Sequence, residues 1–154
     1  MKLPEIGAPA PSFSLPADGG RTISLDELRG KIVVLYLYPK DDTPGCTKEA
    51  VGFSEHAASF EDAGALVLGL SKDTVAKHDK FIAKHDLKVG LLSDDAEVVE
   101  AYGAWVEKSM YGKKYMGIER STFVIDKDGI LRHEWRKVKV PGHVDAVLEA
   151  VKAL

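Results

Sequence analysis

The sequence predicts an α/β fold in which helices flank both faces of a mixed β-sheet. Two observations lead to this prediction. Short apolar runs of strand length alternate with helix-like segments along most of the chain, which favours parallel strands joined by crossover helices. Near the end, two apolar runs are separated only by a turn at Asp128-Gly129, which predicts an antiparallel hairpin. The sheet should therefore contain both strand directions.

The N-terminal arm is predicted to add a β-hairpin to this sheet. Pro9, Pro11 and Pro16 keep the arm extended rather than helical. Two alternating segments, 11–15 and 21–24, flank a Gly-Gly turn and are expected to pair with each other. Ser24 is predicted to cap the turn 25–28, with Glu27 three residues later as in a capping box.

The other elements follow in the order strand, helix, strand, helix, strand, helix, strand, strand, helix. The predicted strands cover residues 32–38, 65–71, 91–93, 121–126 and 130–135. The predicted helices cover residues 44–63, 74–85, 97–102 and 144–154. The chain contains no internal repeat, low-complexity tract or long linker, so residues 1–154 are expected to form a single domain.

The composition of the chain excludes several kinds of partner and location for this protein. A formal net charge of -3 gives no reason to expect a nucleic acid or an anionic membrane as partner. No apolar run approaches the roughly 20 residues that span a bilayer, and the start lacks the apolar core of a signal peptide. A single cysteine cannot form an internal disulfide. We therefore expect a cytoplasmic protein from a reducing compartment.

No metal site is expected from the histidines. His78 and His85 lie seven residues apart and share one face of the predicted helix 74–85. No cysteine or carboxylate cluster accompanies them as metal ligands would require. Lysines flank both, so this helix face is predicted to be solvated.

Cys46, the single cysteine, is the most informative residue. It follows the predicted strand 32–38 and falls in the first turn of a helix that Pro44 opens. The free N–H groups and the dipole at a helix start favour an anion. We therefore expect an unusually acidic thiol, present as thiolate near neutral pH, although most isolated cysteines are inert core residues. Cys46 is thus a candidate nucleophile.

The residues around Cys46 resemble a known family. Pro39, Thr43 and Cys46 match the Pro-x-x-x-Thr-x-x-Cys signature of peroxiredoxins. The resemblance to the bacterioferritin comigratory protein (PrxQ) branch extends over three segments, residues 38–50, 102–108 and 117–126. It implies a thioredoxin-like fold, a thiol-dependent peroxidase activity, no cofactor, and a monomer.

The resemblance also implies roles for these residues. Cys46 attacks one oxygen of the peroxide, while backbone N–H groups near Gly45 and Cys46 donate to the peroxide oxygens. The Thr43 hydroxyl contacts the peroxide, and Pro39 shields the thiol. Thr43 and Pro39 also have purely structural explanations. Thr43 is a suitable helix cap, and Pro39 is a suitable residue to end a strand.

Two charged residues complete the predicted site. Arg120 brings a fixed positive charge and a planar fork of donors, which would stabilise both the thiolate and the polarised O–O bond. Glu49 lies three residues after Cys46 on the same helix face and is assigned the role of holding Arg120. Taken singly, Arg120 would be a surface charge and Glu49 a solvated helix position.

The chain departs from the PrxQ pattern at Val51. Many PrxQ proteins carry a resolving cysteine at this position, five residues after the first, and others carry it on the following helix. Here both places lack one, so a one-cysteine mechanism is predicted in which an external thiol reduces the oxidised Cys46. Thioredoxin, glutaredoxin, glutathione and Cys46 of another subunit are the candidates. Val51 as an engineered replacement of cysteine stays an alternative.

The leading hypothesis is a thiol-dependent peroxidase that reduces hydrogen peroxide and small organic hydroperoxides through a Cys46 sulfenic acid. A redox relay that passes oxidation from Cys46 to a partner protein is the alternative. A binding module with an inert thiol is a third. Sustained turnover with a reducing system separates the peroxidase from the relay, and the behaviour of Cys46→Ser separates both from the binding module.

Overall fold

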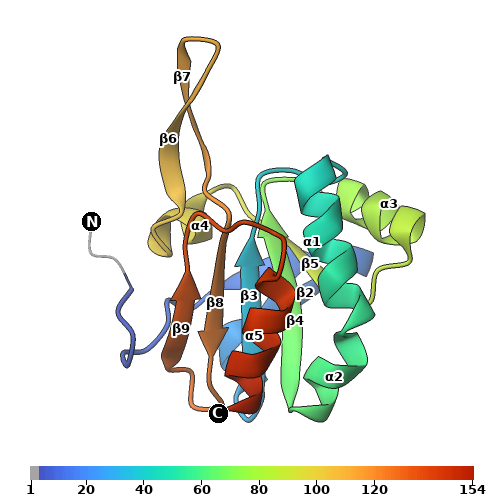
Figure 1. Cartoon of the computed structure of the whole chain (residues 1–154), viewed down its shortest axis with the longest axis vertical. Coiled ribbons are helices and arrows are strands. Elements are labelled where there is room, and N and C mark those ends of the chain that lie inside the picture. Colours follow the sequence, from blue (N-terminus) through green and yellow to red (C-terminus); the bar gives the residue numbers. More distant parts are fainter. Residues whose placement is uncertain (1–3) are drawn as a thin grey trace.

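The computed structural model describes residues 4–154 and contains a seven-stranded mixed sheet (Figure 1). Its strand order is β2-β1-β5-β4-β3-β8-β9. The strands are β1 (Ser14–Ala17), β2 (Arg21–Ser24), β3 (Ile32–Leu37), β4 (Ala65–Ser71), β5 (Gly90–Ser93), β8 (Ser121–Ile125) and β9 (Leu131–Trp135). Strands β3, β4 and β5 are parallel, whereas β1 pairs antiparallel with β2 and β5, and β8 pairs antiparallel with β3 and β9. The predicted mixed sheet and N-terminal hairpin are therefore present.

Helices cover both faces of this sheet. They are α1 (Pro44–Glu55), α2 (Ala57–Asp62), α3 (Val75–His85), α4 (Glu97–Ala101) and α5 (His143–Lys152), with short 3₁₀ helices η1 (Asp18–Gly20) and η2 (Leu25–Leu28). Helices α1, α2, α3 and α5 supply apolar side chains to one core cluster. Helix α4 and the N-terminal segment supply the cluster on the other face. Among the described residues, no helix has both the length and the apolar character needed to cross a bilayer.

Strand β3 lies inside the sheet between β4 and β8, and all its residues are buried. Successive side chains point to opposite faces, so Val34 and Tyr36 join the cluster under α1 while Val33 and Leu35 join the cluster under α4. A strand buried on both faces needs apolar residues at every position, which explains its unbroken apolar run. The end of β3 therefore delivers the chain from a rigid core into the loop before Cys46.

The helix predicted over 44–63 is broken into α1 and α2 at His56. The His56 ring Nδ1 lies 3.0 Å from the Gly52 carbonyl oxygen, which would otherwise accept the His56 backbone N–H. That N–H bonds instead to the Phe53 carbonyl at 3.2 Å. The side chain thus competes with the helical ladder and ends α1.

The capping box predicted at Ser24 is wrong. Ser24 flanks η2, but its side chain makes no bond to the helix. Its hydroxyl donates to the Ser14 hydroxyl at 2.8 Å, because these residues are directly paired across the β1–β2 hairpin. The Ser24 hydroxyl is therefore bonded across the hairpin and not to the helix.

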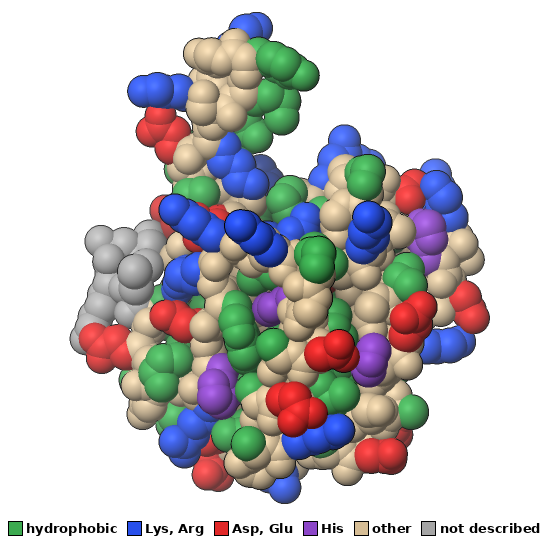
Figure 2. All heavy atoms as spheres, viewed as in Figure 1, with side chains coloured by type: hydrophobic (Ala, Val, Ile, Leu, Met, Phe, Trp, Pro, Cys, Tyr) green, Lys and Arg blue, Asp and Glu red, His purple; other side chains and the backbone are tan. Residues whose placement is uncertain are grey.

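A further hairpin, which the apolar pattern does not predict, rises from the body of the molecule (Figure 1). It consists of β6 (Trp105–Met110) and β7 (Lys113–Ile118), paired antiparallel. Its outer part exposes large apolar side chains, visible in Figure 2, which are those of Met110, Tyr111, Tyr115 and Met116. Its base reaches the core through Ile118 and Trp105, but its outer part lacks the buried face that gives a strand its alternation.

Candidate active site

The candidate site lies where β3 ends and α1 begins. Residues 38–43, which we call the Cys46 loop, join the two elements, and Pro44 occupies the first position of α1. The first intrahelical bond runs from the Thr47 N–H to the Thr43 carbonyl at 2.8 Å. The N–H groups of Gly45 and Cys46 therefore precede the helical ladder and stay available for an anion. The Cys46 side chain itself is buried, with 1% of the residue exposed.

Arg120 is placed against Cys46 from a distant part of the chain. It lies between β7 and β8, and its Nη2 donates to Cys46 Sγ at 3.1 Å. Its Nη1 donates to Glu49 Oε1 at 2.7 Å. Burial opposes the positive charge, but Glu49 and Cys46 outweigh that effect and keep the pKa of Arg120 raised. The guanidinium fork thus holds a thiol and a carboxyl group one helical turn apart.

Gly45 leaves the space that this arginine occupies. A Cβ atom at Gly45 would lie 3.2 Å from Arg120 Nη2. That separation is tighter than ordinary van der Waals contact, so any larger residue would push the guanidinium away. The glycine therefore serves close approach at this position.

Glu49 is fully buried behind Arg120. Its Oε2 makes no hydrogen bond to any described residue, and burial raises the pKa of the carboxyl to about 7 against the opposing effect of Arg120. His143 Nε2 lies 4.0 Å from Oε2 and 2.8 Å from Thr122 Oγ1. Burial and the Arg120 charge lower the pKa of His143 to about 4, so the ring is neutral at pH 7.

The structure brings Cys46, Glu49 and Arg120 into direct contact. Thr43 is the residue before α1, but its hydroxyl donates to the Lys40 carbonyl at 2.9 Å and does not cap the helix. Pro39 is exposed at the start of the Cys46 loop. The burial of Glu49 and Arg120 rules out solvated positions for them, while the catalytic roles of all these residues stay predictions.

Sequence reasoning missed two neighbours and misplaced a third residue. Thr122 and His143 lie behind Glu49, and their separation of 21 residues in the chain gives no pattern that would reveal their contact. His78 was predicted on a solvated face, but it is fully buried. That prediction is wrong because Asp41 and the Leu92 carbonyl supply polar partners inside the core.

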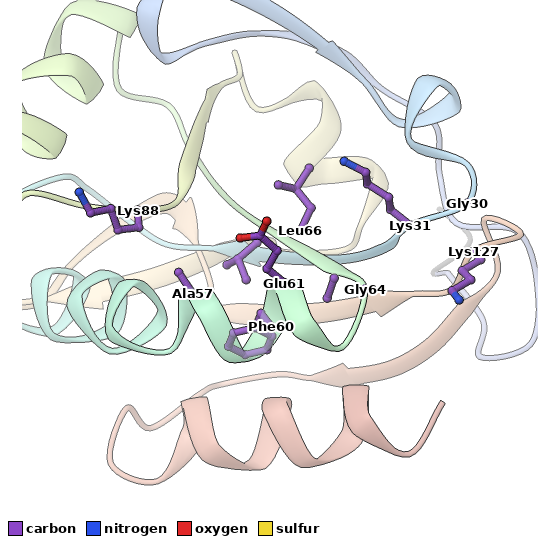
Figure 3. Close-up of a pocket in the computed structure, with 11 residues that line it drawn as sticks. Gly30, Lys31, Ala57, Phe60, Glu61, Gly64, Leu66, Lys88 and Lys127 are labelled. Carbon is purple, nitrogen blue, oxygen red and sulfur yellow. The ribbon is translucent and has the colours of Figure 1, made fainter.

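A separate hollow of about 500 Å³ lies at the opposite end of the central strands (Figure 3). It opens where β3 and β4 begin, whereas Cys46 follows the end of β3. Its lining contains no cysteine, and comprises Gly30, Lys31, Ala57, Phe60, Glu61, Gly64, Ala65, Leu66, Val67, Lys88 and Lys127. Thiol chemistry therefore belongs to the Cys46 site and not to this hollow.

Comparisons with known proteins agree with this geometry. The AhpC/TSA family model matches residues 6–134, and the chain belongs to that family. The Bcp peroxiredoxins of Coxiella burnetii and Bacillus subtilis are 54% and 50% identical to it, over 94% and 96% of this chain and 96% and 95% of theirs. A Xanthomonas campestris bacterioferritin comigratory protein, solved in a study of its alkyl peroxide reduction activity, aligns with a TM-score of 0.88. It is 46% identical and covers 92% of this chain and 90% of its own.

Within the family, the chain lies in the Bcp (PrxQ) branch of the peroxiredoxins, which are thiol-dependent peroxidases. The predicted thioredoxin-like fold is confirmed by the same structural match. The single cysteine fits the one-cysteine type that the sequence predicts.

Proposed function

We propose that this protein reduces hydrogen peroxide and small organic hydroperoxides through a sulfenic acid on Cys46. The contact that supports this most strongly is the 3.1 Å hydrogen bond from Arg120 to Cys46 Sγ inside a buried site. A guanidinium donor at this distance can form a charged hydrogen bond to a thiolate, which is the nucleophilic form of cysteine. The Xanthomonas relative's alkyl peroxide reduction activity supports organic hydroperoxides as substrates.

The first half of the reaction follows from the site. The Cys46 thiolate attacks one peroxide oxygen, the O–O bond breaks, and the second oxygen leaves as hydroxide or alkoxide. That anion takes a proton to give water or alcohol, and Cys46 becomes a sulfenic acid. In this proposal the N–H groups of Gly45 and Cys46, together with Arg120, stabilise the negative charge that develops on the leaving oxygen.

The second half needs a thiol from outside the chain, since Cys46 is the only cysteine in the sequence. One external thiol attacks the sulfenic sulfur, forming a mixed disulfide and releasing water. A second thiol attacks that disulfide, restoring the Cys46 thiolate and leaving the reductant oxidised. Thioredoxin, glutaredoxin and glutathione all have this chemistry.

A coupled peroxidase assay tests the proposal. NADPH consumption is followed with hydrogen peroxide or a small organic hydroperoxide, using thioredoxin, glutaredoxin with glutathione, or glutathione alone. Sustained turnover with at least one of these systems is expected, and Cys46→Ser should abolish it. A single stoichiometric oxidation without turnover would instead support the relay, in which Cys46 passes its oxidation to a partner protein.

A further inference from the structure

A buried polar network joins the Cys46 loop to α3. His78, on α3, places Nδ1 2.6 Å from Asp41 Oδ2 and Nε2 2.8 Å from the Leu92 carbonyl oxygen. The Tyr38 hydroxyl donates to the other oxygen of Asp41. His78 is fully buried, and Asp41 is 8% exposed. The loop is therefore attached to a helix that lies outside the β3–α1 unit.

The partners of His78 determine how its ring is protonated. A backbone carbonyl can only accept, so Nε2 carries a hydrogen. Nδ1 faces the Asp41 carboxyl group, and an ionised carboxylate there also accepts, so that both nitrogens would donate and the ring would be an imidazolium. Burial alone would lower the pKa of His78, but the hydrogen bond and charge of Asp41 outweigh it and raise that pKa. Removing either partner would leave the other as an unpaired buried charge.

Two further contacts hold the same loop. The Asp41 N–H donates to Asp73 Oδ2 at 2.8 Å, which ties the loop to the end of β4. Asp42, in the left-handed region with φ of 60°, accepts from Lys84 and His85 of α3 at 2.7 and 3.1 Å. The Asp42 contacts are exposed and so contribute little, which leaves the Asp41–His78 pair as the main attachment to α3.

A hollow of about 360 Å³ lies between the Cys46 loop and α3. Most of its lining residues carry a charge, and the lining comprises Lys40, Asp41, Asp42, Asp73, Lys77, Lys80, Phe81 and Lys84. Polar bonds thus hold Asp41 and Asp42 of the loop in place.

Cys46 is too buried for a thiol on another molecule to reach its sulfur while the loop stays in place. We propose that Asp41 and His78 are positioning residues for the two halves of the cycle. When Asp41 and His78 are paired, they hold the Cys46 loop, which includes Thr43, in the form that reacts with peroxide. Separated, they release the loop so that an external thiol reaches oxidised Cys46. This inference rests on the proposed function.

The two half-reactions, measured separately by stopped flow on the full chain, test the pair. In His78→Gln and Asp41→Asn, oxidation of Cys46 by hydrogen peroxide should slow about tenfold, as expected for loss of a charged hydrogen bond. Reduction of oxidised Cys46 by glutathione should be as fast as in the wild type or faster. His133→Gln, a histidine variant on β9, should match the wild type in both steps. Equal slowing of both steps, or no change in either, would contradict the pair's role.

Two readouts do not depend on peroxidase activity. In the reduced protein, amide hydrogen exchange of residues 41–43 should be faster in Asp41→Asn and His78→Gln than in the wild type. Nitrogen NMR of the wild type at pH 7 should show both His78 ring nitrogens protonated. A singly protonated ring, or unchanged exchange in both variants, overturns the inference. A wild type that does not react with peroxide overturns the proposed function instead.

Discussion

Glu49 and His143 lie behind Arg120, and burial disfavours the ionised form of both. The pKa of Glu49 is raised from 4.5 to about 7, so between these pH values the unfolded chain has lost a proton that the folded chain keeps. Its contribution to the free energy of unfolding therefore falls as pH rises. The pKa of His143 is lowered from 6.5 to about 4, so the unfolded chain binds the extra proton and its contribution rises with pH. Each of these two pH-dependent contributions to the free energy of unfolding amounts to about 3 kcal/mol. In the wild type they have opposite signs and largely cancel.

Replacing either Glu49 or His143 should reveal the pH dependence of stability that the other residue contributes. Relative to the wild type, the free energy of unfolding of Glu49→Gln should rise more steeply with pH between about 4.5 and 6.5. That of His143→Gln should fall with pH over the same range. Urea unfolding at several pH values measures both slopes. Two variants with the wild-type slope would show that these groups do not titrate as the structure implies.

Gly45→Ala should impair the chemistry without unfolding the protein. The added methyl group would lie 3.2 Å from Arg120 Nη2 and displace the guanidinium from Cys46. We expect the rate of peroxide attack to fall about tenfold, because a charged hydrogen bond is lost. Stopped-flow oxidation measures this rate, and Lys48→Ala, an exposed residue of the same helical turn, is the control. An unchanged rate in Gly45→Ala would mean that Arg120 tolerates the methyl group.

The residues that sequence reasoning recovered are those whose chemistry is tied to a local motif. Cys46 and Glu49, which the structure brings together with Arg120, stand in one short segment, and Arg120 stands in a second segment that resembles the family. His143 and His78 were missed because their contacts with Glu49 and Asp41 depend on how α5 and α3 pack. Spacing along the chain carries no information on such contacts.

At the scale of elements, the β6–β7 hairpin turns through Tyr111 and Gly112, with φ of 51° and 78°. Two central residues of positive φ define a type I′ turn, in which asparagine before glycine is preferred. Tyr111 is 98% exposed, so its bulky ring gains no packing that offsets the strained backbone.

Tyr111→Asn should therefore stabilise the hairpin by up to about 1 kcal/mol. Amide hydrogen exchange in β6 and β7 measures the local effect, and exchange should slow there but not in β3. Tyr115→Asn, on the neighbouring strand, is the control and should not slow exchange. Faster exchange in Tyr111→Asn would show that the tyrosine ring contributes to the hairpin.

Elements with a buried face were predicted well, and those without one were not. Strands β3 and β4 and helix α3 begin and end close to the predicted residues because burial imposes an apolar pattern on them. The β6–β7 hairpin has no such pattern, and the break at His56 depends on one side chain reaching a carbonyl. Both features are decided by local geometry that periodicity does not report.

At the scale of the whole molecule, stability depends on the two core clusters that meet across β3. Leu35 is fully buried in the cluster under α4, so Leu35→Ala should lower the free energy of unfolding by about 2–5 kcal/mol. Leu66→Ala, at a partly buried position of β4, should have a smaller effect. Denaturant unfolding measures both. Equal losses of unfolding free energy in the two variants would mean that the cost of removing a leucine side chain does not depend on how deeply it is buried.

The central claim is that peroxide oxidises the sulfur atom of Cys46, and mass spectrometry tests it most directly. The reduced protein is mixed with one equivalent of hydrogen peroxide, with and without added glutathione, and digested to locate the change. We predict one added oxygen atom on Cys46, replaced by a glutathione adduct when that thiol is present, and neither product in Cys46→Ser. An unmodified Cys46, or oxygen found only on methionine, would contradict the claim.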